Sequence, residues 1–359
     1  MFIDGKIFSI QKQGGISRLY YELLRFKNPD RSCTLYRGRY QDSYDWSCIS
    51  NVQNIGLPRK LNGNFINRLE RVTDPIWLEY EWLKAKKVDS TYISTYYRLP
   101  SFLSRSHIVV GDYDCVHERF PDLFPGVDKV ISTKRRAFSR ADLIMTISES
   151  SKLDIMKFYG IMEDKIRVFP LGVDAFFDRP LDPKSDLCCS DKPFLLYVGS
   201  RAHYKNFSML QKAFESGLKK HYDLIVVGGG DMMDVEKAPF GHSVSWLSAN
   251  DAELKDLYQR AAALVYPSRY EGFGLPPLEA LCCGCPVVVT DNPVARETLG
   301  EHTEYFLWND LPSFLEAVEL AVQHSPKRRE AAYNHARTYT WKKSADRFYS
   351  QIELSKASL

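Results

Sequence analysis

Two glutamates, Glu271 and Glu279, stand on either side of a glycine loop in the segment 263–290, which reads ALVYPSRYEGFGLPPLEALCCGCPVVVT. Gly272 and Gly274 belong to the loop, and the residues after them predict a helix whose first N–H groups can bind an anion such as phosphate. Carboxylates repel phosphate but accept hydrogen bonds from hydroxyl groups. The pattern therefore predicts a ligand that combines phosphate with sugar hydroxyls, as a nucleotide sugar does.

The loop is predicted to join a buried strand to a helix. Residues 263–266 form a short apolar run typical of a strand, and Pro276 and Pro277 suit the first helical turn, where a missing N–H costs nothing. Gly284 can end the helix in the left-handed conformation, and residues 286–290 predict a second buried strand. An ordinary surface helix with two glutamates would explain neither the glycines nor the paired prolines.

The string PSRYEGFGLPPLEAL, followed by GCPVV, resembles the signature of the retaining GT-B glycosyltransferases of family 4. The resemblance implies an α/β protein with two Rossmann-like domains whose parallel sheets face each other across a cleft. The implied acceptor-side domain is residues 1–176 together with a helix at 341–359 that crosses back to it. The implied nucleotide-sugar domain is residues 177–340.

The same resemblance assigns roles to the residues of the loop and helix. Glu271 would bind the hexose hydroxyls and act in catalysis, and Glu279 would bind the ribose diol. The remaining donor contacts in this segment would come from Gly272, Phe273, Gly274 and Leu275.

The string GSRAHYKN places two cations near another predicted strand end. It follows the apolar run 194–198, and Arg201 and Lys205 are four residues apart beside Gly199 and Ser200. Two fixed positive charges at this spacing can hold one diphosphate, which is the role that the family resemblance implies. Their charge would stabilise the leaving group without a metal ion, so no metal and no cofactor are expected. A solvated basic loop is the alternative.

The second half of the chain alternates predicted strands and helices, which indicates a parallel α/β sheet. The nucleobase is expected near Val244 and Leu247 in this half. Residues 226–230 read VVGGG and suggest a dinucleotide fingerprint, but Met233 stands where its third glycine would be. An oxidoreductase is therefore disfavoured.

The first half contains a second glycine pair, Gly14 and Gly15, in the string QKQGGISRLYYELL. Apolar residues follow it at helical spacing, so the pair is predicted at a helix amino terminus and could form a second phosphate site. A simple turn is the alternative reading. The string resembles the amino-terminal glycine loop of the same family, which implies contact with the donor diphosphate and the acceptor. The runs 2–3 and 7–8 before it are predicted to be short strands.

Residues 107–121, HIVVGDYDCVHERFP, pass from a strand-like run into a polar loop. In an open parallel sheet, ligands bind at the carboxyl ends of the strands, so Asp114 is a candidate catalytic residue and His117 a candidate acceptor contact. Tyr113 precedes Asp114 where many relatives of the family have histidine. Its role could be contact with a substrate or a hydrogen bond that orders the loop.

Residues 57–87 mix basic and aromatic side chains at roughly helical spacing. They could form a helix that lies on an anionic membrane surface, or a pair of amphipathic helices that pack their aromatic rings into the core. The basic members are Arg59, Lys60, Arg68, Arg71, Lys84, Lys86 and Lys87, and the hydrophobic ones include Phe65, Ile66, Trp77, Tyr80 and Trp82.

Length and composition limit the number of domains, the kinds of partner and the location that can be expected. A chain of 359 residues can hold two cores, and a net charge of +3 is too small to indicate nucleic-acid binding. No signal peptide and no run of eighteen apolar residues is found, so a cytoplasmic location is expected, with peripheral contact at the inner face of the membrane if residues 57–87 bind lipid. Cys282 and Cys285 form a CxxC that is interpreted as buried thiols, with a metal or redox site as the alternative. Residues 181–192 are the predicted linker.

The combined prediction is a retaining, metal-independent glycosyltransferase that moves a hexose from a nucleoside diphosphate sugar to a hydroxyl of a growing surface glycan or a lipid-linked acceptor. GDP-mannose is the first choice of donor and a UDP-hexose the second, since the GGISR and YDCVHERFP strings look most like mannosyltransferases of bacterial surface polysaccharides. Two alternatives remain open. One is a nucleotide-sugar-binding module without turnover, and the other is a sugar-nucleotide epimerase of similar fold.

Overall fold

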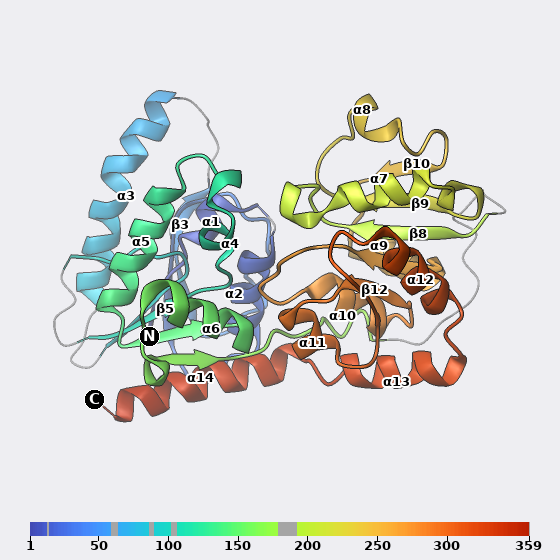
Figure 1. Ribbon diagram of the computed structural model, residues 1–359. Coiled ribbons are helices and arrows are strands. Elements are labelled where there is room, and N and C mark those ends of the chain that lie inside the picture. The colour runs from blue at the N-terminus through green and yellow to red at the C-terminus, as the bar shows by residue number, and fades with distance from the viewer. Residues whose placement is uncertain (13, 59–63, 86–89, 102–105, 179–191, 359) are drawn as a thin grey trace. The chain divides into compact units, whose positions relative to one another are not determined.

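The computed structural model describes residues 1–358 apart from 13, 59–63, 86–89, 102–105 and 179–191, and it does not describe the side chains of 58 and 64–71. The chain divides into two compact units, Met1–Leu171 with Trp341–Leu359, and Gly172–Thr340. Each unit has its own parallel β-sheet and its own core (Figure 1). All but one residue of the predicted linker lies outside the described residues.

The first unit is built on a seven-stranded parallel sheet of order β3-β2-β1-β4-β5-β6-β7. Its strands are β1 Phe2–Asp4, β2 Cys33–Tyr40, β3 Val52–Pro58, β4 Thr91–Ser94, β5 His107–Gly111, β6 Leu143–Thr146 and β7 Ile166–Val168. Its α-helices are α1 Ile7–Ile10, α2 Gly15–Arg25, α3 Asn64–Ala85, α4 Val116–Arg119, α5 Val127–Arg140, α6 Glu149–Tyr159 and α14 Trp341–Ala357, with 3₁₀ turns at Pro121–Leu123 and Glu163–Lys165. The central strands are buried along their whole length, as parallel strands with two covered faces must be.

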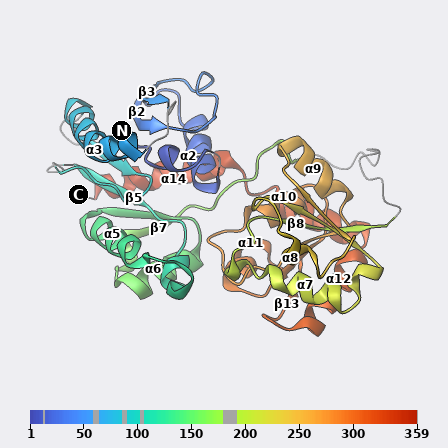
Figure 2. The same ribbon diagram turned by 90° about the horizontal axis from the view of Figure 1, so that it is seen from above.

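Helices α3 and α5 cover the same face of this sheet. Leu78 and Trp82 of α3 and Phe138 of α5 join one core cluster with residues of β1, β4, β5 and β6. The Phe2 ring meets the Trp82 ring edge to face, with their centroids 5.4 Å apart. On the chain's return from the second unit, α14 packs beside α2, where the Tyr349 hydroxyl donates to the Leu23 carbonyl at 3.1 Å (Figure 2).

Two local predictions in this unit were wrong. Ile7 and Phe8 form a helical turn rather than a strand, because the chain turns directly after β1 and the Ile7 N–H donates to the Thr95 hydroxyl at 3.2 Å. Residues 64–85 form one helix that continues through Pro75, not a pair. Arg59, Lys60, Lys86 and Lys87 of the basic stretch lie outside the described residues.

The second unit is built on a six-stranded parallel sheet of order β10-β9-β8-β11-β12-β13. Its strands are β8 Phe194–Val198, β9 Asp223–Val227, β10 Val244–Leu247, β11 Ala263–Tyr266, β12 Val287–Thr290 and β13 Glu304–Phe306. Its α-helices are α7 Phe207–Glu215, α8 Asp234–Lys237, α9 Asp251–Arg260, α10 Leu275–Cys282, α11 Pro293–Leu299, α12 Leu311–Val322 and α13 Pro326–Ala336, with 3₁₀ turns at His203–Lys205 and Leu218–Lys220. The strand–helix alternation predicted for this half is confirmed.

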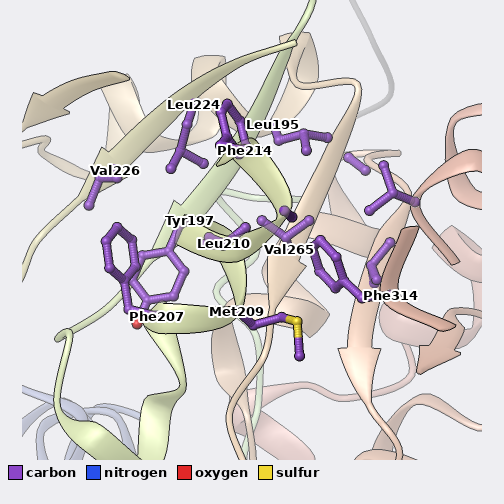
Figure 3. Packing of buried hydrophobic residues seen from close by; sticks show 14 of the residues in the cluster. Leu195, Tyr197, Phe207, Met209, Leu210, Phe214, Leu224, Val226, Val265 and Phe314 are labelled. Carbon is purple, nitrogen blue, oxygen red and sulfur yellow. The ribbon is translucent and has the colours of Figure 1, made fainter. Parts of the chain in front are cut away.

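The core of the second unit lies between the sheet and helices α7 and α12. Figure 3 shows side chains of β8, β9 and β11 meeting those of α7 and α12. The rings of Tyr197 and Phe207 pack edge to face at 5.1 Å. This packing fixes β8 and α7, and with them the loop between the two that carries Arg201 and Lys205.

No helix among the described residues is both long enough and apolar enough to cross a membrane.

Candidate active site

The glycine loop and helix of the second unit have the predicted form. Strand β11 leads into the loop, and Gly274 is the residue before α10, with a left-handed φ of +87° that favours glycine. Prolines occupy the first turn of α10, and Gly284 follows the helix with φ +76°. The amino terminus of α10 thus begins four residues after Glu271 and follows the carboxyl end of β11, and of its first three residues only Leu275 has an N–H group.

Lys205 and Glu271 come together at this end of the sheet. The Lys205 Nζ donates to Glu271 Oε1 at 2.5 Å, and both side chains are partly exposed, at 13% and 16%. Burial by itself would lower the pKa of Lys205, but the neighbouring Glu271 carboxylate raises it above its ordinary value. The ammonium is therefore charged at neutral pH. A backbone bond from the Arg269 N–H to the Tyr204 carbonyl, 2.8 Å long, ties together the loops that carry the pair.

Glu279 is nearly buried, with 5% of its surface exposed. Its Oε2 accepts from the Tyr258 hydroxyl of α9 at 3.2 Å. Burial, followed by the Glu279 charge, raises the pKa of Tyr258 well above its usual range. Tyr258 is a partner that the sequence reasoning missed, because nothing in the spacing of α9 and α10 shows which side chains face each other.

Arg201 contacts different groups from Lys205, although the two were expected to hold one diphosphate. Its Nη1 donates to the Gly228 carbonyl at 3.2 Å, and its Nη2 to the carbonyls of Gly230 and Asp231 at 3.0 and 2.9 Å. Its Nε donates to Glu236 at 2.9 Å.

The other predicted donor contacts lie around these loops. Gly199 has φ +138°, and the exposed Ser200 accepts a hydrogen bond from the Tyr197 hydroxyl at its carbonyl. Val244 is half-buried and Leu247 is exposed, and both belong to the edge strand β10. Phe273 is buried in the loop against Tyr339.

The glycine pair of the first unit is at a helix amino terminus, as predicted. Gly14 precedes α2 and Gly15 begins it. The Gln11 side chain occupies part of this terminus, because its Oε1 accepts from the Ser17 N–H at 3.2 Å. An anion bound here would compete with Gln11 for that N–H.

Tyr113 is buried, and its hydroxyl lies 2.9 Å from both the Tyr20 hydroxyl and the Thr95 carbonyl. This geometry favours the structural alternative over contact with a substrate. Asp114 is half-buried and uses Oδ1 to accept from the Val116 N–H at 3.1 Å. His117 is also half-buried, and its ring packs against the Phe124 ring with a centroid distance of 4.6 Å.

A buried ionic cluster under this loop was not predicted. The Lys134 side chain is 1% exposed, and its Nζ lies 2.9 Å from Asp112 Oδ1, Glu118 Oε1 and the Asp114 carbonyl. Burial raises the pKa of Asp112 to about 6, against the opposing effect of Lys134. The lysine fixes the backbone of Asp114. The only sequence signal was a lysine at a position of α5 where the helical period predicts a core residue.

The CxxC cysteines behave as buried thiols. Burial raises the pKa of Cys282 and of Cys285 to about 12 each, which leaves both protonated at neutral pH. The cysteines in the described part of the chain are free, and no group of three or more metal-binding side chains is found among its residues. Cys188 and Cys189 lie outside that part.

Comparison with known proteins finds a family that matches most of the second unit and relatives that match a larger part of the chain. Residues 178–338 match the family described as glycosyl transferases group 1. The O-antigen chain mannosyltransferase RfbU of Salmonella typhimurium is 29% identical over 274 residues, which cover 70% of this chain and 72% of RfbU. The O-antigen chain mannosyltransferase B of Escherichia coli is 28% identical over 239 residues, covering 61% and 62% of the two chains.

Among solved structures, sucrose-phosphate synthase from Thermosynechococcus elongatus superimposes with a TM-score of 0.76 at 16% identity, covering 100% of this chain and 99% of that one. The expected fold is confirmed: the two parallel-sheet units have the GT-B architecture. Residues 178–338, within the second unit, match the group 1 family, and the protein is a glycosyltransferase.

Proposed function

We propose that this glycosyltransferase transfers mannose from GDP-mannose to a hydroxyl of a growing surface glycan or a lipid-linked acceptor, with retention of configuration and without a metal ion. Two relatives named as O-antigen chain mannosyltransferases support this choice of sugar. A UDP-hexose is the second choice of donor.

The observation that carries the proposal is the Lys205–Glu271 pair. An ammonium has three N–H donors, and the described residues supply one hydrogen-bond acceptor to Lys205, the Glu271 carboxylate. The remaining donors can bind phosphate oxygens of the donor sugar. Charge that develops on the departing nucleoside diphosphate would then be stabilised by a cation already fixed in place.

Glu271 has a second role in this proposal. Its carboxylate anchors Lys205 and can accept hydrogen bonds from the hexose hydroxyls, which places the anomeric carbon near the cation. Glu279, linked to Tyr258, would bind the ribose. On the acceptor side, Asp114 would bind the attacking hydroxyl from a loop that Lys134 holds rigid, with His117 beside it.

A panel of nucleotide sugars tests the donor. A ligand at a hundred times its dissociation constant adds roughly 2.7 kcal/mol to the free energy of unfolding, so GDP-mannose should raise the Tm more than UDP-glucose does. Slow donor hydrolysis without acceptor would separate an active enzyme from a binding module, and an epimerase would convert the donor to an isomeric nucleotide sugar. Absence of stabilisation by every nucleotide sugar would contradict the proposal.

Membrane contact through the first unit is also part of the proposed function. Four side chains of α3 repeat at helical spacing on its outer face and are between 49% and 65% exposed: Val72, Ile76, Tyr80 and Leu83. The acidic side chains described on α3, those of Asp74, Glu79 and Glu81, are less exposed. Asp74 binds the Tyr36 hydroxyl at 2.8 Å, and Glu79 binds the Ser101 N–H at 2.8 Å. Among the described side chains of α3, the outer face is thus apolar and its acidic neighbours Asp74 and Glu79 are paired.

Basic residues lie on the outer side of the second helix on this face of the sheet. Lys129, Arg136 and Arg140 of α5 are exposed and share one side of the helix by their spacing of seven and four residues. Lys84, near the end of α3, is 62% exposed at its side chain. An apolar stripe beside cationic side chains matches an anionic lipid surface. The side chains of Arg68 and Arg71, which were predicted to contribute, lie outside the described residues.

Vesicle sedimentation tests the contact. Binding to vesicles with anionic lipid should exceed binding to neutral vesicles and should weaken with salt. The variant Ile76→Ser/Tyr80→Ser and the variant Arg136→Glu/Arg140→Glu should each reduce it. Equal sedimentation of wild type and both variants would contradict membrane contact and leave the donor proposal intact.

A further inference from the structure

Tyr97, in the segment that follows β4, has a left-handed backbone conformation with φ +57°. In the described part of the chain, the other residues with positive φ are glycines and asparagines, which adopt this conformation far more readily than a bulky residue does. Backbone strain of this kind persists only where the surrounding contacts fix it, and it is common at sites that bind a substrate. The segment after β4 is therefore held in one particular shape.

The Tyr97 side chain is anchored in the core of the first unit. Its hydroxyl donates to Asp112 Oδ1 at 2.7 Å, and the Lys134 Nζ lies 2.9 Å from the same oxygen. The Tyr97 ring meets the Phe138 ring edge to face, with their centroids 6.1 Å apart. The ionic cluster around Lys134 thus holds both the loop after β5 and the strained residue after β4.

The segments that follow β4 and β5 lie side by side. The two strands are parallel neighbours in the sheet, so both segments leave it at the same edge. Besides the bond made by Tyr97, the Thr95 carbonyl accepts from the Tyr113 hydroxyl at 2.9 Å, which ties the two segments together a second time. Tyr96 therefore lies beside the loop that carries Asp114.

Tyr96 and Asp114 each have a polar group available for a ligand. Tyr96 is half-buried, and its ring packs against the Tyr97 ring at a centroid distance of 5.1 Å. Among the described residues, neither the Tyr96 hydroxyl nor Asp114 Oδ2 has a hydrogen-bond partner. Burial, followed by the Asp114 charge, raises the pKa of Tyr96 above its ordinary value. The phenol is therefore protonated at neutral pH and can both donate and accept a hydrogen bond.

Two such groups on neighbouring segments match two adjacent hydroxyl groups of a sugar ring. A carboxylate only accepts, so Asp114 Oδ2 suits the hydroxyl that attacks the donor. The phenol of Tyr96 can bind the hydroxyl on the next ring carbon, in either sense of the hydrogen bond. One contact leaves the sugar free to present a different hydroxyl to the donor, whereas two contacts fix which hydroxyl is presented.

We propose that Tyr96 binds the acceptor hydroxyl next to the one that Asp114 binds, and that Tyr97 is the residue that positions Tyr96. The two contacts select an acceptor sugar with two adjacent free hydroxyl groups and decide which of them is glycosylated. Tyr97 acts through Tyr96 and does not itself contact the acceptor. This inference rests on the proposed function, since it assumes that Asp114 binds the attacking hydroxyl.

The experiment measures transfer to the methyl glycosides of mannose, glucose, galactose and N-acetylglucosamine, with GDP-mannose as donor, or UDP-glucose if GDP-mannose is not used. The product formed from the best of these acceptors shows the attacked position. Tyr96→Phe should raise the KM of that acceptor about tenfold, the effect of one lost hydrogen bond. The KM of the donor and the slow hydrolysis of the donor should stay at their wild-type values, because Tyr96 does not contact the donor.

Deoxy analogues of the best acceptor test the contact directly. An analogue that lacks the hydroxyl bound by Tyr96 should have a kcat/KM about tenfold lower than the parent sugar with the wild type. With Tyr96→Phe, the same analogue should be as good an acceptor as the parent sugar, since the variant has no group left for that hydroxyl. The analogues that lack either neighbour of the attacked position are both measured.

Tyr97→Phe keeps the ring and removes the bond to Asp112. It should raise the KM of the acceptor and give a product in which part of the new linkage is at the adjacent position. Loss of a purely structural contact would lower the Tm and leave the ratio of the two linkages unchanged.

Tyr305→Phe is the matched control. Tyr305 is a half-buried tyrosine of β13 in the second unit, and its hydroxyl donates to the Gly300 carbonyl at 2.7 Å. Its removal takes one hydroxyl from a tyrosine of similar exposure. The KM of the acceptor and the linkage formed should be those of the wild type.

Two results would overturn the inference while leaving the proposed function intact. The first is a wild-type acceptor KM together with the wild-type linkage in Tyr96→Phe. The second is an equal loss in wild type and Tyr96→Phe for both deoxy analogues, which would show that Tyr96 does not contact either hydroxyl. Absence of transfer by the wild type from both donors to all four glycosides would instead count against the proposed function, and the inference would fail with it.

Discussion

Two lysines of this protein lie beside carboxylates near the carboxyl ends of parallel strands, and their surroundings differ. Lys134 in the first unit is 1% exposed and has three oxygen acceptors, from Asp112, Glu118 and Asp114. Lys205 in the second unit is 13% exposed and has one acceptor among the described residues. An ammonium with three partners has no N–H left for a substrate.

Burial and the number of partners, rather than residue type, distinguish the structural Lys134 from Lys205, the cation that we propose acts in catalysis. The first lysine compensates two buried carboxylates and orders a loop. The second keeps its charge near solvent, where a phosphate can complete its coordination. Both have a raised pKa, so the pKa by itself does not distinguish them.

Removal of Lys134 should produce the largest effect. Lys134→Ala would leave Asp112 and Glu118 buried without a cation, and breaking such a pair costs about 3 to 5 kcal/mol in the free energy of unfolding. Urea unfolding monitored by fluorescence measures it. The control is Lys152→Ala in the same unit, where the Glu163 partner is 69% exposed and the loss should stay below about 1 kcal/mol. Equal stability of Lys134→Ala and wild type would refute the structural assignment.

The pH dependence of the free energy of unfolding should show the titration of the Asp112 carboxyl group. Its pKa in the folded protein, about 6, is above the ordinary value of 3.8, so the folded state binds this proton more tightly. The stability that the Asp112 proton contributes is complete below about pH 3 and is lost as the pH rises to 6. The difference in free energy of unfolding between wild type and Asp112→Asn should therefore fall by about 2.4 kcal/mol from pH 4 to 7. A difference that does not change with pH would show that Asp112 titrates normally.

Removal of Lys205 should impair turnover and spare stability. Lys205→Ala should lower kcat about 10²-fold, comparable to the loss of one strong transition-state donor. Its Tm should change little, because a partly exposed carboxylate remains. Lys212→Ala on α7, an exposed lysine that binds Asn309, is the control and should be fully active. A wild-type kcat in Lys205→Ala would contradict the proposal that Lys205, unlike Lys134, acts in catalysis.

Substitution of Glu271 and substitution of Glu279 should impair different steps, turnover in the first case and nucleotide binding in the second. Glu271→Gln should depress kcat while free GDP still binds, since its proposed partner is the hexose. Glu279→Gln should raise the Kd of GDP about tenfold, the effect of one charged hydrogen bond to the ribose. Tyr258→Phe should also raise the Kd of GDP. Equal loss of GDP affinity in both glutamate variants would contradict the assignment.

The smallest expected effect is that of a chelator. If Lys205 and the N–H groups of the loops stabilise the leaving diphosphate, transfer by the wild type should be unchanged in EDTA. Added Mg²⁺ should not restore activity to Lys205→Ala. Activity that disappears in EDTA and returns with Mg²⁺ would overturn the metal-independent mechanism.

The amino-acid sequence by itself determined the local structure of the site. The helix start at Gly274, the strand at 263–266 and the glycine pair at α2 depend on φ preferences, proline positions and hydrophobic period, which act over a few residues. The family motif and the alternation of strands and helices can also be recognised from the local sequence. The helical turn at Ile7 was predicted as a strand, because two apolar residues are too few to distinguish the helical from the strand period.

Only the tertiary structure decided which groups these residues face. Arg201 and Lys205 are four residues apart in the sequence, yet one contacts the end of β9 and the other the end of β11. Lys134 meets Asp112 across 22 residues, and Tyr113 turns its hydroxyl into the core. Such partners are set by strand order and helix packing, which bring together residues far apart in the chain. Burial, which follows from that packing, then decides the charge state and the accessibility of each group.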